Sequence, residues 1–149
     1  MINEIMEEIT KEKSLQHKTL ESILVVETQT PFADLDEEVK LAIRSASEKK
    51  GFDIVALDLR EVTSFAEFFV IASGANQRQV QAISDEIDEQ LKKQLQMRPI
   101  RIEGYTSAEW ILLDYGDFIV HIFEQKAREF YDLERLWRDA KKVELPKEI

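Results

Sequence analysis

Residues 68–103 read FFVIASGANQRQVQAISDEIDEQLKKQLQMRPIRIE, and this stretch contains the pattern that decides the fold. Its first apolar run, residues 68–72, is short and bounded by polar residues, as expected of a strand covered on both faces. Apolar side chains then recur every three or four positions and predict a helix with one buried stripe that ends before Pro99. These positions are Val80, Ile83, Ile87, Leu91 and Leu95. Residues 100–103 alternate apolar and charged, which predicts a second strand and therefore a right-handed parallel crossover.

The segments on either side extend this layered pattern. Before it, Asp36 can cap a helix that ends near Gly51, a position where a left-handed residue is needed, and residues 54–57 form a further apolar run. After it, residues 110–113 and 118–123 flank the sequence Asp-Tyr-Gly-Asp, which predicts an antiparallel hairpin. An amphipathic helix follows at residues 130–137. The fold class predicted is α/β, with a mixed five-stranded sheet flanked by helices.

The length of 149 residues suits one domain with a terminal extension. We assign residues 1–34 to an N-terminal extension that is partly helical or disordered, and residues 35–149 to the domain. Ile2, Ile5, Met6 and Ile9 have helical spacing, so this extension is expected to pack as a short arm on its own domain or on a second copy. The apolar residues 20–26 fit a helix or a strand equally well, and residues 28–31 are interpreted as a linker.

Charge and composition restrict the classes of partner. The formal net charge is -10, so phosphate backbones should repel the chain, and a basic protein is a better electrostatic match than RNA or DNA. The chain contains no cysteine, which excludes disulfides and thiolate metal sites. The N-terminus is acidic and lacks the apolar stretch of an export signal or membrane span, so a cytoplasmic protein with no membrane contact is expected.

Few residues have the spacing of a catalytic site. Asp114 and Asp117 could hold a divalent cation, but hydrogen bonds from Asp side chains to the turn backbone are the favoured interpretation. His121 is expected to be a partly buried histidine with a local hydrogen bond and not a general base. Residues 73–76 lack the phosphate-loop patterns, so helix capping by Asn76 is expected there. Trp110 is interpreted as either a core residue or an interface anchor.

Several motifs, in this order along residues 35–145, resemble the ribosome-silencing factor family, which is also called the Iojap-like family. They are ALDLR at 56–60, FFVIASG at 68–74, RQV at 78–80, EG at 103–104, WILLDYGD at 110–117, VHIF at 120–123 and REFYDLERLW at 128–137. The mixed charges around this last motif indicate a solvated helix face. Each motif alone is weak, whereas their joint order is specific.

The resemblance implies a nucleotidyltransferase-like fold, frequent homodimers, and binding to the fourteenth protein of the large ribosomal subunit at the subunit interface. It implies a silencing factor that blocks association with the small subunit and represses translation, with no catalytic residue, cofactor or metal. The residues expected to mark or support the partner surface are Trp110, Asp114, Tyr115, Asp117 and His121, with Glu103 and Phe68. Two alternatives are a large-subunit assembly factor and a divergent metal-dependent nucleotidyltransferase using Asp58, Asp114 and Asp117. The second lacks the paired aspartates on one strand that such enzymes use.

Overall fold

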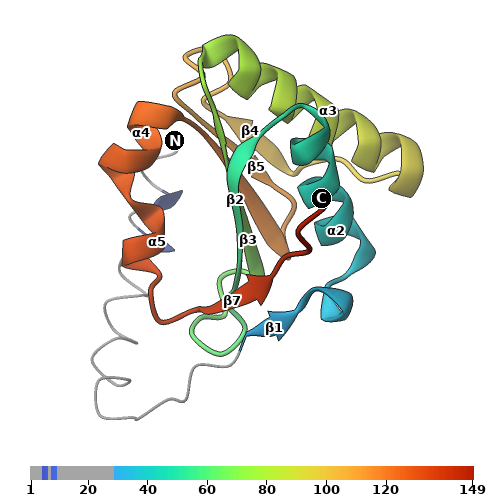
Figure 1. Cartoon of the computed structure of the whole chain (residues 1–149), viewed down its shortest axis with the longest axis vertical. Coiled ribbons are helices and arrows are strands. Elements are labelled where there is room, and N and C mark those ends of the chain that lie inside the picture. Colours follow the sequence, from blue (N-terminus) through green and yellow to red (C-terminus); the bar gives the residue numbers. More distant parts are fainter. Residues whose placement is uncertain (1–4, 7, 10–28) are drawn as a thin grey trace.

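The computed structural model describes residues 5, 6, 8, 9 and 29–149, and within them the chain forms one mixed sheet with helices on both faces (Figure 1). The sheet has seven strands in the order β1-β7-β2-β3-β6-β5-β4. The strands are β1 (Thr30–Pro31), β2 (Phe52–Asp58), β3 (Phe68–Gly74), β4 (Arg101–Glu103), β5 (Trp110–Asp114), β6 (Phe118–Glu124) and β7 (Lys141–Glu144). The helices are the 3-10 turn η1 (Phe32–Asp34), α2 (Glu37–Glu48), α3 (Gln77–Leu95), α4 (Gln125–Tyr131) and α5 (Leu133–Leu136).

The pairing confirms the predicted α/β class and the predicted hairpin. β5 and β6 are antiparallel, and β3 is parallel to β6 over its full length. β4 is antiparallel to β5 and therefore runs in the direction of β3, as the crossover requires. Two strands lie between β3 and β4, because the hairpin partner β6 inserts next to β3.

The sheet contains two strands beyond the five predicted ones. β7 pairs with the end of β2, and β1 pairs with β7 at the edge of the sheet. The interpretation of residues 28–31 as a linker is therefore wrong for Thr30 and Pro31. A two-residue strand is too short to show periodicity, and a proline is tolerated at a sheet edge because its missing N–H faces no neighbour.

The end of α2 differs from the prediction in one residue. Asp36 occupies the N-cap position, although its side chain makes no capping hydrogen bond. The left-handed residue after the helix is Lys50, with φ of 60°, and not Gly51. Gly51 is required for a different reason, since a Cβ there would lie 2.8 Å from the carbonyl oxygen of Ala46.

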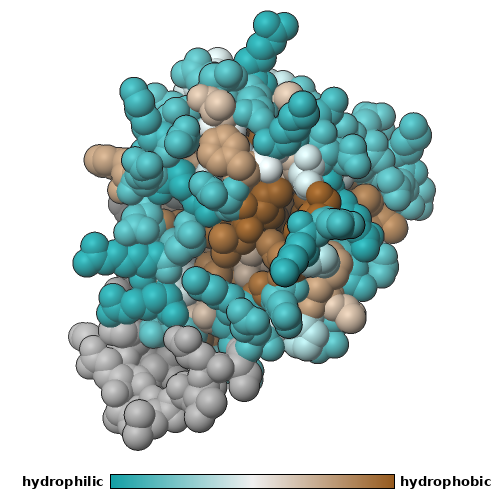
Figure 2. Space-filling model, in the orientation of Figure 1, coloured by the Kyte–Doolittle hydropathy of each residue, from teal (hydrophilic) through white to brown (hydrophobic). Residues whose placement is uncertain are grey.

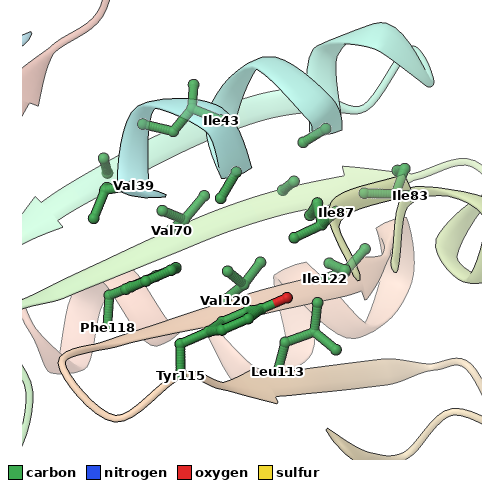
Figure 3. Packing of buried hydrophobic residues seen from close by; sticks show 14 of the residues in the cluster. Val39, Ile43, Val70, Ile83, Ile87, Leu113, Tyr115, Phe118, Val120 and Ile122 are labelled. Carbon is green, nitrogen blue, oxygen red and sulfur yellow. The ribbon is translucent and has the colours of Figure 1, made fainter. Parts of the chain in front are cut away.

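The side chains of each central strand alternate between two cores. Phe68, Val70 and Ala72 of β3 face α2 and α3, in the cluster shown in Figure 3. Phe69 and Ile71 point to the opposite face, into a second cluster that includes Leu133 and Trp137 from the α5 region. Figure 1 shows α4 and α5 on that second side of the sheet. Both faces of β3 are thus covered, as its apolar run predicts.

Ile5, Met6 and Ile9 of the N-terminal extension belong to this second cluster. Residues 5, 6, 8 and 9 are helical, and Ile5 and Ile9 are 6% and 0% exposed. The predicted helical arm is therefore seen to pack on its own domain at these residues. Ile2 and the apolar residues 20–26 lie outside the described residues. Among the described residues, no helix is long and apolar enough to cross a membrane.

Candidate functional site

The turn of the β5–β6 hairpin is held by Asp114. Its Oδ1 accepts a hydrogen bond from the Gly116 N–H at 2.8 Å, and its other oxygen lies 3.8 Å from Nε of Arg101. Gly116 has φ of 89°, a conformation that favours glycine. The Tyr115 N–H donates to the Phe118 carbonyl at 3.0 Å and closes the turn. The expected turn role of Asp114 is confirmed.

A polar hollow of about 420 Å³ lies beside this turn. It is lined by Arg60, Thr63, Ser64, Phe65, Ala66, Glu67, Gly116 and Asp117. Asp117 and Glu67 are both exposed, and the two are tied together because the Glu67 N–H donates to the Asp117 carbonyl at 2.7 Å. Two carboxylates and one guanidinium therefore surround the hollow, which gives this end of the sheet an acidic surface.

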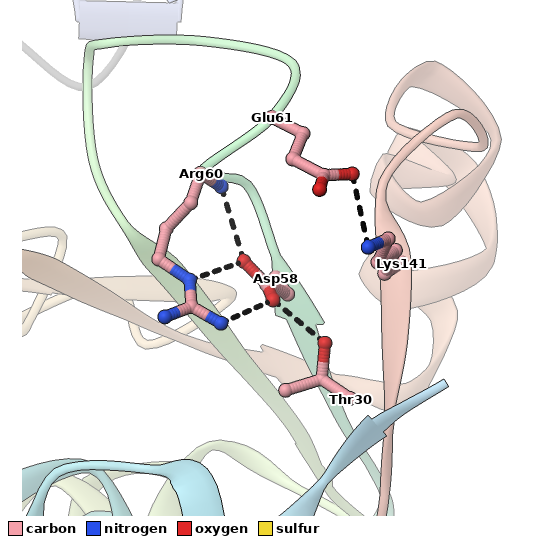
Figure 4. Close-up of polar contacts among 5 residues, drawn as sticks. All are labelled: Thr30, Asp58, Arg60, Glu61 and Lys141. Carbon is pink, nitrogen blue, oxygen red and sulfur yellow. Dashed lines mark hydrogen bonds and ion pairs between the residues drawn. The ribbon is translucent and has the colours of Figure 1, made fainter. Parts of the chain in front are cut away.

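Asp58 lies at the same end of the sheet, in the network of Figure 4. Its carboxylate accepts from Nε and Nη2 of Arg60 at 3.0 and 2.8 Å, and from the Thr30 hydroxyl at 2.6 Å. Burial raises the pKa of Asp58, but the hydrogen bonds from Arg60 and Thr30 outweigh it, so the pKa lies below its ordinary value. The hydrogen bond between Asp58 and Thr30 thus links the end of β2 to β1.

An aromatic cluster fills the second core between the hairpin and α4. The Trp110 Nε1–H donates to Nδ1 of His121 at 3.0 Å, and the His121 ring packs edge-on against Phe69. Burial, together with the nearby charge of Arg128, lowers the pKa of His121 to about 3. The imidazole is therefore neutral with its proton on Nε2, because Nδ1 is an acceptor. His121 is fully buried, more deeply than expected.

The predicted position of Arg128 on a solvated helix face is wrong. Its side chain is only 10% exposed and donates to Ser73 Oγ at 2.8 Å, to the Asp53 carbonyl at 2.7 Å and to Glu134 at 2.7 Å. It therefore ties α4 to β2 and β3. The sequence does not predict this buried position, because a buried arginine and a solvated one occur among the same pattern of neighbouring charges.

The seven predicted partner-surface residues fall into two groups. Phe68, Trp110, Tyr115 and His121 are all buried, and burial raises the pKa of the Tyr115 hydroxyl. These four hold the sheet together. Asp114 and Glu103 are half-buried and Asp117 is exposed, so this second group retains access to solvent. Asp114 and Asp117 lie together at the turn, whereas Glu103 lies at the far end of β4, opposite Leu112.

Two of the aspartates proposed for the nucleotidyltransferase alternative make hydrogen bonds or ion pairs with neighbouring residues. Asp58 is paired with Arg60, and Asp114 with Gly116 and Arg101. Within residues 5, 6, 8, 9 and 29–149, no group of three or more His, Cys, Asp or Glu is placed to hold a metal ion. At the N-terminus of α3, Asn76 Oδ1 accepts from the Gln79 N–H at 2.9 Å, which confirms the predicted cap.

Apolar side chains also reach the surface at several places, of which two lie near strands at or close to the sheet edges. Ile100 precedes the edge strand β4 and is 71% exposed, and Ile102 lies within β4 and is 43% exposed. Figure 2 shows a second apolar patch, surrounded by hydrophilic side chains, over the region between β2 and α2 in Figure 1. β2 pairs with β7 only at Leu57 and Asp58, so its earlier residues lack a strand neighbour on that side within the described part of the chain.

Comparison with known proteins gives concordant matches. The sequence profile of a family described as "Ribosomal silencing factor during starvation" matches residues 33–149. The ribosomal silencing factor RsfS of Halalkalibacterium halodurans is 43% identical over 112 residues, covering 73% of this chain and 92% of the relative. "Mitochondrial assembly of ribosomal large subunit protein 1" of Mus musculus is 25% identical over 103 residues, 67% of this chain and 45% of the relative. A crystal structure from Bacillus halodurans has a TM-score of 0.64 and 37% identity, and the match covers 73% of this chain and 98% of that one.

Proposed function

Because this chain belongs to the ribosomal silencing factor family, we propose that it binds the large ribosomal subunit and blocks its association with the small subunit. The observation that carries the proposal is the match across residues 33–149, which includes the whole domain. In this role the protein represses translation by occupying a surface that the small subunit needs, without a chemical step. No catalytic residue or cofactor is required by such a mechanism.

The partner that fits best is a basic protein of the large subunit, and we assign the role to its fourteenth protein. A net charge of -10 favours association with a basic surface and slows approach to exposed rRNA. Glu67, just before β3, and Asp117, in the hairpin turn, form the exposed acidic rim of the hollow, which can meet basic side chains. Asp114 acts indirectly, because its bond to the Gly116 N–H sets the shape of the turn.

The free protein is proposed to be a homodimer, in keeping with the resemblance to its family. The exposed apolar patches at β4 and beside β2 are two surfaces that could support self-association. Sedimentation equilibrium of the purified chain measures this directly. A monomer mass at micromolar concentration would contradict the homodimer but not the ribosome binding.

The binding proposal is tested by reversing one exposed charge. The hydrogen bond between Asp117 and Glu67 uses the backbone carbonyl of Asp117, so it does not depend on the side chain. The variant Asp117→Lys therefore changes the charge at this position and leaves that hydrogen bond in place. The matched control is Glu48→Lys, an exposed residue at the end of α2, which leads into the opposite end of the sheet. We expect Asp117→Lys to remain folded and to lose co-sedimentation with isolated large subunits, while Glu48→Lys binds as the original chain does. Equal binding by both variants would contradict docking through the hairpin end.

A second candidate function is assembly of the large subunit, which the printed name of the mouse relative favours. An assembly factor is needed before the subunit matures, and a silencing factor acts on the finished subunit. Depletion of the protein in growing cells separates the two. Accumulation of immature large subunits would favour assembly, whereas a normal subunit profile with excess joining under starvation would favour silencing.

A further inference from the structure

The second core of the molecule has a cover that comes from outside the domain. Most of its members belong to β3, β5, β6 and the α5 region, but Ile5 and Ile9 come from the N-terminal extension. Both are enclosed, with 6% and 0% of their surface exposed, in the same cluster as Trp110, Leu112 and Ile119. The extension therefore contributes apolar side chains to the second core.

The contact has the pattern of an amphipathic helix lying on an apolar face. Ile5 and Ile9 are four residues apart and thus lie on one side of a helical turn. Met6 is partly buried against the same cluster, and Glu8 is exposed to solvent. A helix this short is not stable alone in water, so its order depends on the face that it covers.

This cover lies outside the part of the chain that the family shares. The family profile begins at residue 33, well after Ile9. The Bacillus halodurans structure is matched over 98% of its own length by 73% of this chain, so it has almost no chain left to form a similar extension. A relative with 37% identity thus has little chain beyond the part that it shares with this protein. A segment that is added to the shared domain could regulate the binding of partners to that domain.

The covered face also continues into an exposed aromatic surface. Trp110 packs on Tyr131 at 4.7 Å between ring centroids, and Tyr131 packs on Phe130 at 5.1 Å. Tyr131 is 47% exposed and Phe130 is 81% exposed, which is unusual for a phenylalanine on a monomer surface. Exposed apolar groups that adjoin a displaceable cover are typical of a site that takes up an apolar segment of another protein.

We propose that the helical residues Ile5, Met6, Glu8 and Ile9 are a built-in, displaceable occupant of a docking face that includes Trp110, and that the large subunit displaces them with an amphipathic segment of its own. The inference rests on the proposed binding to the large subunit. The free chain is then held in a closed state, and only the open fraction can bind through this face. If the closed state is favoured about tenfold, apparent affinity falls by about the same factor.

The test uses the full chain and its two tryptophans, Trp110 and Trp137, both of which lie in the covered cluster. The variant Ile5→Ser/Ile9→Ser should loosen the cover, and Glu8→Ser is the matched control in the same turn. We expect the double variant to keep its circular dichroism spectrum, to show increased acrylamide quenching of tryptophan fluorescence, and to bind large subunits about tenfold more tightly. The control should match the original chain in all three measurements.

Two results would overturn the proposal. Unchanged quenching in the double variant would show that Ile5 and Ile9 do not cover the tryptophans. Increased quenching with equal or weaker binding to large subunits would show that Ile5 and Ile9 stabilise the fold but do not compete with large subunits for this face.

If the double variant does not fold, a chain that starts at residue 29 replaces it, with a synthetic peptide of residues 1–13 added back. The peptide should restore protection from quenching and weaken large-subunit binding, and failure to do either would count against the cover. If the original chain, the double variant and the shortened chain all fail to bind large subunits, the proposed function fails, while the quenching results still decide whether the cover exists.

Discussion

The buried pair of Trp110 and His121 predicts a loss of stability in mildly acidic solution. His121 is neutral in the folded protein, with a pKa of about 3, because it is fully buried and lies near Arg128. In the unfolded chain its pKa returns to about 6.5. The folded pKa is the lower one, so the unfolded state binds more protons between these values, and stability falls as pH decreases through this window.

The size of the effect follows from the two pKa values. Between pH 7 and pH 5 the folded imidazole stays neutral, while the unfolded one becomes almost fully protonated. Each pH unit well inside the window changes the unfolding free energy by about 1.4 kcal/mol, which gives about 2 kcal/mol over the whole interval. Asp58 titrates at lower pH, since its pKa lies below its ordinary value, and it does not contribute here.

Urea unfolding of the original chain and of His121→Asn at both pH values measures this contribution. Asparagine keeps an acceptor oxygen near the position of Nδ1, so it can still accept from Trp110, but it does not titrate. The variant should be less stable at pH 7, because it packs less volume, and should lack the loss of about 2 kcal/mol at pH 5. The second histidine, His17, is present in both proteins, so its titration cancels. An equal pH-dependent loss in both proteins would refute the neutral buried histidine.

Four further substitutions test the packing around the site by thermal and urea unfolding. The Tyr115 hydroxyl is buried without a hydrogen-bond partner among the described residues, so Tyr115→Phe should be neutral or stabilising and should reduce the stability loss above about pH 10; a destabilised variant would contradict this. Arg128→Lys should lower the unfolding free energy by about 2 kcal/mol, because an ammonium cannot reproduce the forked geometry, and Glu134→Gln should lower it less; equal losses would assign the role to the ion pair alone. Gly51→Ala should lower it by about 1–3 kcal/mol, because the new Cβ would meet the Ala46 carbonyl, and an unchanged value would place that carbonyl elsewhere.

The parts of the fold that were predicted from the sequence are those with a repeating apolar pattern. The five predicted strands, β2 to β6, and the helices α2 and α3 have such patterns, and all of them are present. β1 and β7 were missed because their pairing depends on contacts between the two ends of the chain, which no local pattern records. β7 reads Lys-Lys-Val-Glu and buries only Val143, so its sequence resembles a charged tail.

The candidate site was predicted less completely, since sequence motifs do not distinguish exposed residues from buried ones. Trp110 and His121 are motif residues that the structure places inside the second core, where they bond to each other. Asp117 belongs to the same motif but is exposed. Glu67 was not predicted as a site residue, because it meets Asp117 only through the pairing of β3 with β6. A carboxylate next to the start of a buried strand was the one signal that could have indicated it.

The subunit-joining reaction tests the central claim most directly. Isolated large subunits are mixed with the purified chain, small subunits are added, and the fraction of joined ribosomes is measured by sucrose-gradient sedimentation. We predict that the fraction of joined ribosomes falls in proportion to the fraction of large subunits that carry the protein. The variant Asp117→Lys at the same concentration should leave the joined fraction as it is without the protein. Full joining while the original chain co-sediments with every large subunit would contradict silencing.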